Sequence, residues 1–121
     1  MVTDTKFRQV EPDITVVEIA GRLTLGNALQ SLEASLQKAI DEGARKLVID
    51  VAAVNYLDSA AIGMLVGCNG YMEQKGGRVR IAGAQGPIAK VFAIAHLDRI
   101  LPLDADVPSA CESLSQGSAA V

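Results

Sequence analysis

The sequence has no tryptophan and little of several other residue types that usually mark a function. It contains two phenylalanines, two tyrosines, two cysteines and one histidine in 121 residues. So few aromatic side chains argue against a nucleic-acid surface built on base stacking. A net charge of −3, with no basic block, argues against binding to a phosphate backbone. We therefore expect no nucleic-acid partner.

The sequence also lacks the patterns that mark membrane, secreted and metal-binding proteins. No apolar run approaches the roughly 20 residues that a membrane-spanning helix needs, and residues 1–6 lack the order of a secretory signal. Cys68 and Cys111 are too few for a disulfide framework, and His96 has neither a second histidine nor a CxxC motif near it. The sequence predicts a cytoplasmic protein with reduced thiols, no metal, no cofactor and no direct insertion into a membrane.

Apolar periodicity predicts strands that alternate with helices. Strands are expected at residues 6–10, 14–19, 46–51, 78–82 and 99–103, and helices at residues 27–42, 60–75, 87–96 and 107–114. Glu11-Pro12-Asp13 predicts a hairpin between the first two strands, and Asp50 is expected at a strand end. This order predicts one α/β domain over residues 1–121, with a mixed, mostly parallel sheet, an N-terminal hairpin strand and about four flanking helices. Its core is expected at about residues 5–115, and a frayed tail is expected from Ser115, with residues 116–121 flexible.

Residues 57–63, which read Leu-Asp-Ser-Ala-Ala-Ile-Gly, lie where a strand is expected to lead into a helix. This places the hydroxyl of Ser59 directly after Asp58 at a helix N-terminus, where backbone N–H groups favour negative charge. A phosphoryl group on Ser59 would change the local charge abruptly. The alternative is that Asp58 or Ser59 simply caps the helix.

The helix expected after Ser59 has an unusual face. Small residues recur on it at steps of three, four and three, at Ala60, Gly63, Gly67 and Gly70. Each glycine inside a helix costs about 1 kcal/mol relative to alanine, so we expect this face to allow close approach of a neighbouring helix or of a partner protein. Met64 and Tyr71 adjoin it and would add apolar contact area. A different face is expected to pack on the sheet through Ile62, Leu65 and Met72.

Asp58, Ser59 and His96 do not satisfy the pattern of a hydrolytic triad. In a triad the acid orients the histidine and the histidine reaches the serine, whereas here the acid and the serine are adjacent. No GxSxG motif surrounds the serine, and no glycine-rich segment continues into the GK[ST] of a nucleotide-binding loop. We therefore expect no enzymatic activity.

Four segments together resemble the STAS domain family, typified by bacterial anti-sigma factor antagonists. They are Gly21-Arg22-Leu23, residues 46–51 (KLVIDV), residues 56–59 (YLDS) and Gly76-Gly77 followed by residues 78–81 (RVRI). The resemblance covers about residues 5–115. It implies a mixed sheet flanked by helices, in a protein that acts by binding.

In this family the serine after the aspartate is phosphorylated by an anti-sigma factor with serine kinase activity, and the resemblance carries that role to Ser59. It implies that the unphosphorylated chain captures the anti-sigma factor and frees a sigma factor, and that phosphorylation of Ser59 ends the capture. The partner-binding surface that the resemblance implies comprises Thr24, Asn27, Asp58, Ser59, Ala60, Ile62, Gly63, Met64 and Gly67.

The chain departs from the family pattern at three positions. Ala60 and Ala61 stand where the family often has serine and glycine, which leaves Ser59 as the only hydroxyl acceptor of the motif. Thr24 stands where many relatives have aspartate, and it and Asn27 would either make polar contacts at the rim of the site or cap the first helix. Two further functions stay open, a STAS subunit of a lipid-transport ABC complex and a scaffold of a stress-signalling assembly. The sequence also leaves open whether the chain forms a homodimer.

Overall fold

The computed structural model describes residues 4–119, and in this part of the chain strands alternate with helices after an N-terminal hairpin. The strands are β1 (Asp4–Val10), β2 (Ile14–Leu23), β3 (Lys46–Leu57), β4 (Arg78–Ala82) and β5 (Leu103–Asp104). The helices are α1 (Asn27–Asp41), α2 (Ser59–Gln74), α3 (Gly86–Ile94), the short 3-10 helix η1 (Leu97–Arg99) and α4 (Val107–Ala119). The strands lie in the order β1-β2-β3-β4-β5, with β1 antiparallel to β2 and the other neighbours parallel. This confirms the predicted single α/β domain with a mixed sheet.

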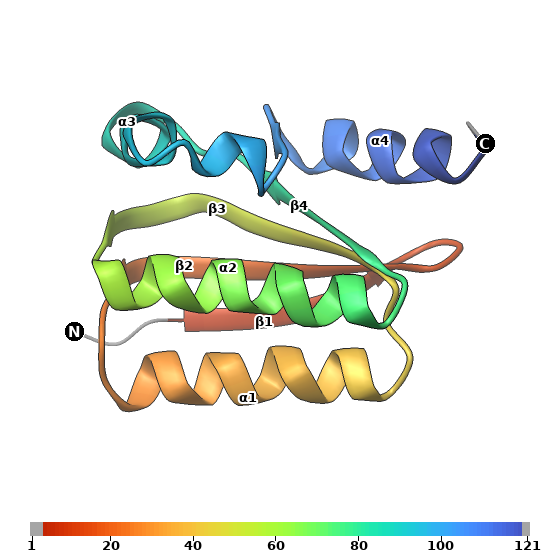
Figure 1. Ribbon diagram of the computed structural model, residues 1–121, viewed down its shortest axis with the longest axis horizontal. Coiled ribbons are helices and arrows are strands. Elements are labelled where there is room, and N and C mark those ends of the chain that lie inside the picture. Colours follow the sequence, from red (N-terminus) through yellow and green to blue (C-terminus); the bar gives the residue numbers. More distant parts are fainter. Residues whose placement is uncertain (1–3, 120–121) are drawn as a thin grey trace.

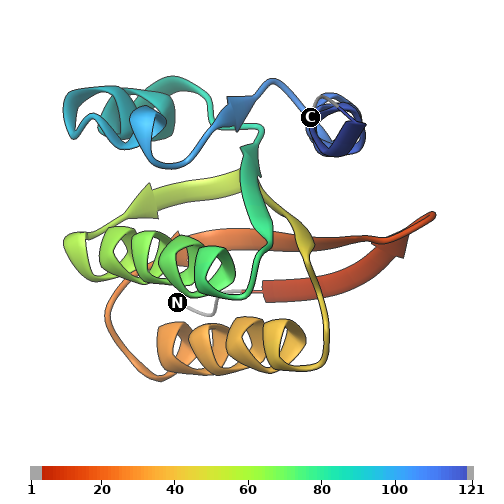
Figure 2. The ribbon, with the colours of Figure 1, turned by 45° about the vertical axis from the view of Figure 1, so that its right-hand side comes forward.

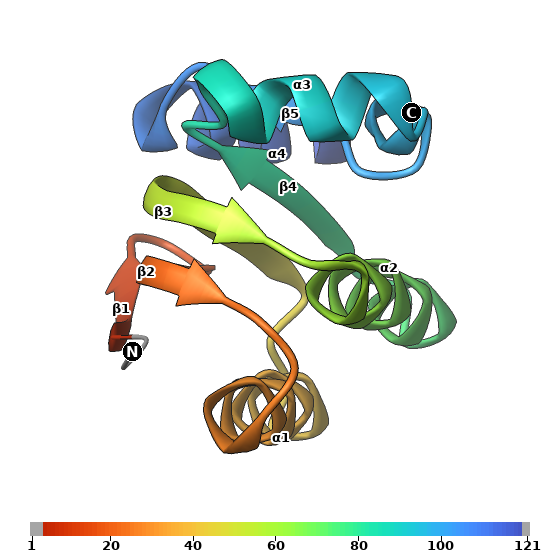
Figure 3. The same ribbon diagram turned by 90° about the vertical axis from the view of Figure 1, so that its left-hand side faces the viewer.

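The helices form two layers, one on each face of the sheet. Helices α1 and α2 cover one face, and α3 and α4 cover the other (Figures 1 and 2). The view along the strands separates the layers most clearly (Figure 3). Among the described residues the buried apolar side chains are aliphatic or sulfur-containing, with Phe92 as the one aromatic exception.

Apolar spacing explains why α1 forms and which face it buries. Its buried residues recur at steps of three and four, at Leu29, Leu32, Leu36 and Ile40. At the other end of the chain, Ala110 and Leu114 anchor α4 on the opposite face of the sheet. The tail expected to be frayed from Ser115 is helical up to Ala119. Residues 120 and 121 lie outside the described part.

Strand β3 is longer than predicted because it stays paired with β2 as far as Leu23–Leu57, through two irregularities in the register. Between the pairs Glu18–Asp50 and Ala20–Ala53, β3 advances by one residue more than β2. Asp50 therefore lies inside the strand and not at its end, and its Oδ1 accepts a hydrogen bond from the N–H of Ala52 at 3.0 Å. Pairing with β2 continues past both bulges to Leu57, so Asp58 lies directly at the carboxyl edge of the sheet.

The segment after β4 also differs from the prediction. The helix expected at residues 87–96 ends at Ile94, and His96 adopts a left-handed conformation with φ of 56° before η1. The strand expected at residues 99–103 shortens to Leu103–Asp104, because Leu97 and Leu101 are buried and joined by a helical-type hydrogen bond of 2.7 Å. Alternation alone could not distinguish this buried turn from a strand.

Candidate functional site

Ser59 lies at the carboxyl edge of the sheet, as the first residue of α2. It is exposed, and no hydrogen bond within residues 4–119 engages its hydroxyl. Leu57, the last residue of β3, and Ala61, in the first turn of α2, are both buried. The backbone is therefore anchored on both sides of the serine. A group attached to its Oγ would therefore project into solvent beside the helix N-terminus.

Asp58 joins the start of α2 to the loop that follows β2. Its Oδ1 accepts a hydrogen bond from the N–H of Ala61 at 2.9 Å, which makes it the N-cap of α2. Its Oδ2 accepts a second hydrogen bond from the N–H of Leu25 at 2.8 Å, and its own N–H donates to the carbonyl of Leu23 at 3.2 Å. The capping interpretation is correct for Asp58, but the same carboxylate also holds a segment 33 residues away in sequence.

The hydrogen bonds from the N–H groups of Leu25 and Ala61 lower the pKa of Asp58 below its ordinary value. A lowered folded-state pKa stabilises the fold above the unfolded-state pKa of about 3.9, and this stabilisation is lost as the pH falls through the folded-state value. We expect Asp58→Asn to have a lower Tm than wild type at pH 7, because an amide cannot replace both acceptors. The difference should shrink as the pH falls below about 4 in thermal unfolding followed by circular dichroism. A difference that is constant with pH would show that the charge is not the cause.

The loop between β2 and α1 contributes the other predicted polar residues. Gly26 is the N-cap of α1, and no side chain makes a capping hydrogen bond there. Thr24 is half-buried and Asn27 is exposed as the first residue of the helix. Neither therefore caps α1 through its side chain, and both flank the backbone that Asp58 holds.

The small-residue face of α2 is open to solvent. A Cβ added at Gly63, Gly67 or Gly70 would meet no atom within 4 Å outside its own helix and chain neighbours. Within residues 4–119 no neighbouring helix therefore packs against these three glycines. Ala60 and Ile62 are half-buried and pack against the core at the edge of the face.

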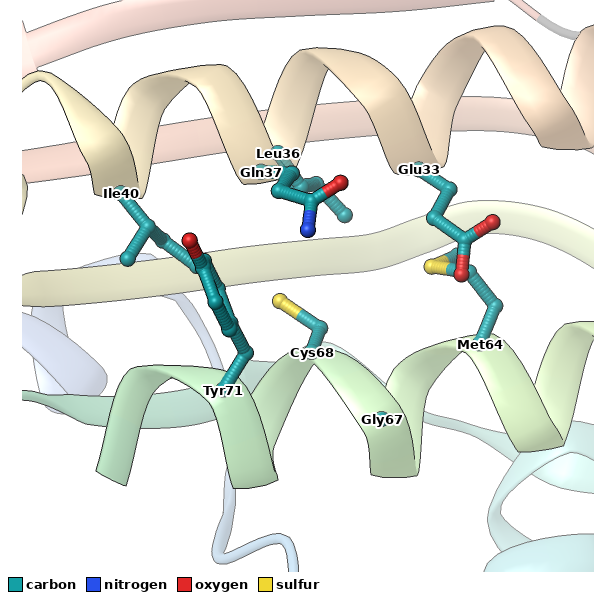
Figure 4. Close-up of a pocket in the computed structure, with 8 residues that line it drawn as sticks. All are labelled: Glu33, Leu36, Gln37, Ile40, Met64, Gly67, Cys68 and Tyr71. Atoms are coloured by element: carbon teal, nitrogen blue, oxygen red, sulfur yellow. The ribbon is translucent and has the colours of Figure 1, made fainter. Parts of the chain in front are cut away.

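Met64 does not lie on that open face. It is 5% exposed and points from α2 toward α1, into the seam between the two helices (Figure 4). The expected apolar contribution of Met64 to a partner surface thus becomes core packing, since it lies one residue beyond Gly63 and turns inward. Tyr71 is half-buried, and its hydroxyl donates a hydrogen bond to Asp41 of α1.

The seam between α1 and α2 contains a small pocket of about 60 Å³. It is lined by Glu33, Leu36, Gln37, Ile40, Met64, Gly67, Cys68 and Tyr71 (Figure 4). The thiol of Cys68 points into it (Figure 4).

Burial raises the pKa of Cys68 to about 11. At pH 8 only about one thiol in a thousand would then be ionised, and the thiolate is the reactive form. Cys111 is only partly buried, and burial raises its pKa as well. We expect the folded protein to react with a disulfide reagent at Cys111 first, with Cys68 reacting only on unfolding. Peptide mapping after timed labelling measures this order, and early labelling of Cys68 would contradict it.

The described residues offer no alternative site of familiar chemistry. Within residues 4–119 no group of three or more His, Cys, Asp and Glu side chains is placed to hold a metal ion. No helix in the same part of the chain has the length and apolar character to cross a bilayer. His96 is exposed and lies between α3 and η1, and α3 covers the opposite face of the sheet from α2 (Figure 3).

Two exposed side chains near this edge were not predicted as site residues. Leu25 is 73% exposed in the loop held by Asp58, and Tyr56 is 43% exposed with the guanidinium of Arg22 4.3 Å from its ring centroid. The signal for Leu25 was an isolated leucine between Thr24 and Gly26, outside the periodic pattern of either neighbouring element. For Tyr56 the signal was an aromatic residue next to Asn55, a few residues after the end of the strand expected at residues 46–51.

Comparison with known proteins places this geometry in a family. A sequence model of the STAS domain matches residues 8–110. An anti-sigma factor antagonist from Mycobacterium paratuberculosis has the same fold, with a TM-score of 0.81 at 21% identity over 93% of this chain and 94% of that one. RsbS of Moorella thermoacetica, solved with a serine-to-glutamate substitution, matches with a TM-score of 0.81 at 20% identity over 95% and 97% of the two chains.

A third solved structure is the Bacillus cell-fate determinant SpoIIAA in its phosphorylated form. It matches with a TM-score of 0.70 at 19% identity, over 94% of this chain and 99% of that one. At these identities the structures establish a shared fold, and the family model adds the sequence evidence. Because that model spans most of the sequence, the chain belongs to the STAS domain family.

Proposed function

We propose that this chain is an anti-sigma factor antagonist. It captures an anti-sigma factor that has serine kinase activity, and phosphorylation of Ser59 ends the capture. The observation that carries the proposal is the exposed hydroxyl of Ser59 at the head of an open glycine face on α2. Among the described residues no atom beyond the helix's own backbone and the chain neighbours lies within 4 Å of a Cβ added at these glycines, although glycine destabilises a helix interior.

The electrostatics around Ser59 suit such a switch. Asp58 is ionised at neutral pH, and the backbone hydrogen bonds that lower its pKa further stabilise this charged form. A phosphate on the adjacent Ser59 would add about −1.5 to −2 charges. The surface would then present two anionic groups side by side, and a partner that fits the unmodified serine would meet repulsion and a desolvation cost.

The fold comparisons support the same function. The matched structures include an anti-sigma factor antagonist, and SpoIIAA was solved in both an unphosphorylated and a phosphorylated form. The chain retains a serine directly after the aspartate, with Ala60 in place of a second hydroxyl. Phosphate transfer within this motif therefore has one acceptor.

The test is affinity capture from host lysate with wild type and Ser59→Asp as bait. Mass spectrometry identifies the bound proteins and the modified residues. We expect an ATP-binding anti-sigma factor to be held by wild type and lost by Ser59→Asp, with phosphate on Ser59 after incubation with ATP. Transport subunits or scaffold proteins held equally by both baits would overturn the proposal and leave Ser59 as part of a helix start.

A further inference from the structure

Leu25 is the most exposed large apolar side chain among the described residues, and its backbone is fixed. Its side chain is 73% exposed, and its N–H donates to Oδ2 of Asp58 at 2.8 Å. The residues on either side are held as well. The carbonyl of Leu23 accepts from the N–H of Asp58 at 3.2 Å, and the carbonyl of Gly26 accepts from the N–H of Gln30 at 3.1 Å, in the first turn of α1.

The same carboxylate places Leu25 beside the start of α2. Asp58 bonds Leu25 through Oδ2 and Ala61 through Oδ1, so the loop and the first helical turn meet across one side chain. Ser59 directly follows this bridge. The segment from β2 to α1 and the start of α2 lie at the same end of the molecule in both views (Figures 1 and 3).

We propose that Leu25 is an apolar anchor for the anti-sigma factor and that Asp58 is the positioning residue that holds it beside Ser59. This inference rests on the proposed function and adds to it a chemical requirement on the partner. The partner must offer an apolar pocket that receives the Leu25 side chain, next to the group that approaches Ser59. An exposed leucine on a fixed backbone suits this role, because little backbone freedom is left to lose when the complex forms.

A single exposed apolar residue is normal on a protein surface, so exposure alone does not distinguish an anchor. The chain provides a matched control in Ile94, which is 72% exposed at the end of α3. Helix α3 covers the opposite face of the sheet from α1 and α2 (Figure 3). Leu25→Ser removes an apolar side chain from the loop between β2 and α1, and Ile94→Ser removes one of the same size and similar exposure from the end of α3.

The binding experiment uses the full chain and the purified ATP-binding anti-sigma factors of the host, titrated singly by calorimetry. We expect Leu25→Ser to weaken the complex by at least about tenfold, since burying a leucine side chain contributes more than one factor of ten. Ile94→Ser should bind within about twofold of wild type. Equal affinities of Leu25→Ser and Ile94→Ser would overturn the anchor. If Ser59→Asp still fails to bind in that case, the proposed function stands and only the anchor is wrong.

Two measurements test the positioning role of Asp58. In the free protein, Asp58→Asn should speed hydrogen exchange of the Leu25 amide, which is read by NMR without any partner. In the complex, the losses caused by Leu25→Ser and Asp58→Asn should be less than additive, because both act through one side chain. Unchanged exchange at Leu25, or strictly additive losses, would overturn the positioning role. A wild-type chain that binds none of the anti-sigma factors would overturn both the proposed function and this inference.

Discussion

Ser59→Asp is expected to weaken the complex with the anti-sigma factor by at least about 100-fold, which corresponds to about 3 kcal/mol. The substitution places a fixed negative charge next to the ionised Asp58, on a surface that must be desolvated in the complex. Folding should be unaffected, because an acidic residue in the first turn of a helix interacts favourably with the helix dipole. The measurement is calorimetric titration of the purified proteins, together with the Tm of each variant.

A second serine provides a matched control for the added charge. Asp106 caps α4 as Asp58 caps α2, with its Oδ1 accepting from the N–H of Ser109 at 2.9 Å. Ser109 is an exposed residue of α4, and α4 covers the opposite face of the sheet from α2 (Figure 3). Ser109→Asp should therefore bind like wild type, and so should Ser59→Ala. An unfolded Ser59→Asp protein, or one that binds as tightly as Ser109→Asp, would show that Ser59 does not control docking.

The elements of the fold could be predicted from sequence where buried apolar residues recur at a regular spacing. The leucines of α1 and the apolar run of β3 each indicate one element and one face, and the structure confirms both elements. The prediction failed where contacts between distant parts of the sequence determine the ends of an element. The length of β3 depends on its pairing with β2, and the short β5 depends on the burial of Leu97 and Leu101. Neither contact leaves a local signal.

The candidate site divides in the same way. Asp58 and Ser59 were predictable because residue type and position at a helix start are local properties. The bridge from Asp58 to Leu25 spans 33 residues and required the structure. Met64 shows the converse difficulty. Its spacing placed it next to the glycine face, but a shift of one residue on a helix turns a side chain by about 100° and carried Met64 into the core.

The glycine face gives the second large effect, in which stability and binding are expected to move in opposite directions. Gly63→Ala should stabilise the fold by about 1 kcal/mol, because alanine is the better helix former and the added methyl meets open space. Gly63→Gln should also be at least as stable as wild type, since glutamine has a higher helix propensity than glycine. Thermal or denaturant unfolding of the free proteins measures both gains.

The same substitutions should weaken binding to the partner, and the larger side chain should weaken it more. Alanine adds one methyl where a partner approaches the backbone closely, whereas glutamine adds a side chain that would have to be displaced or accommodated. We expect Gly63→Gln to weaken capture by at least about tenfold and Gly63→Ala by less. Ala34→Gln is the control, because it adds a comparable side chain at an exposed position of α1. If Gly63→Gln is stable and binds like Ala34→Gln, nothing approaches this face, and its glycines have no role in docking. If Gly63→Gln is instead stable but no longer captures the anti-sigma factor, the glycines lower the stability of α2 in exchange for close approach of a partner to its backbone.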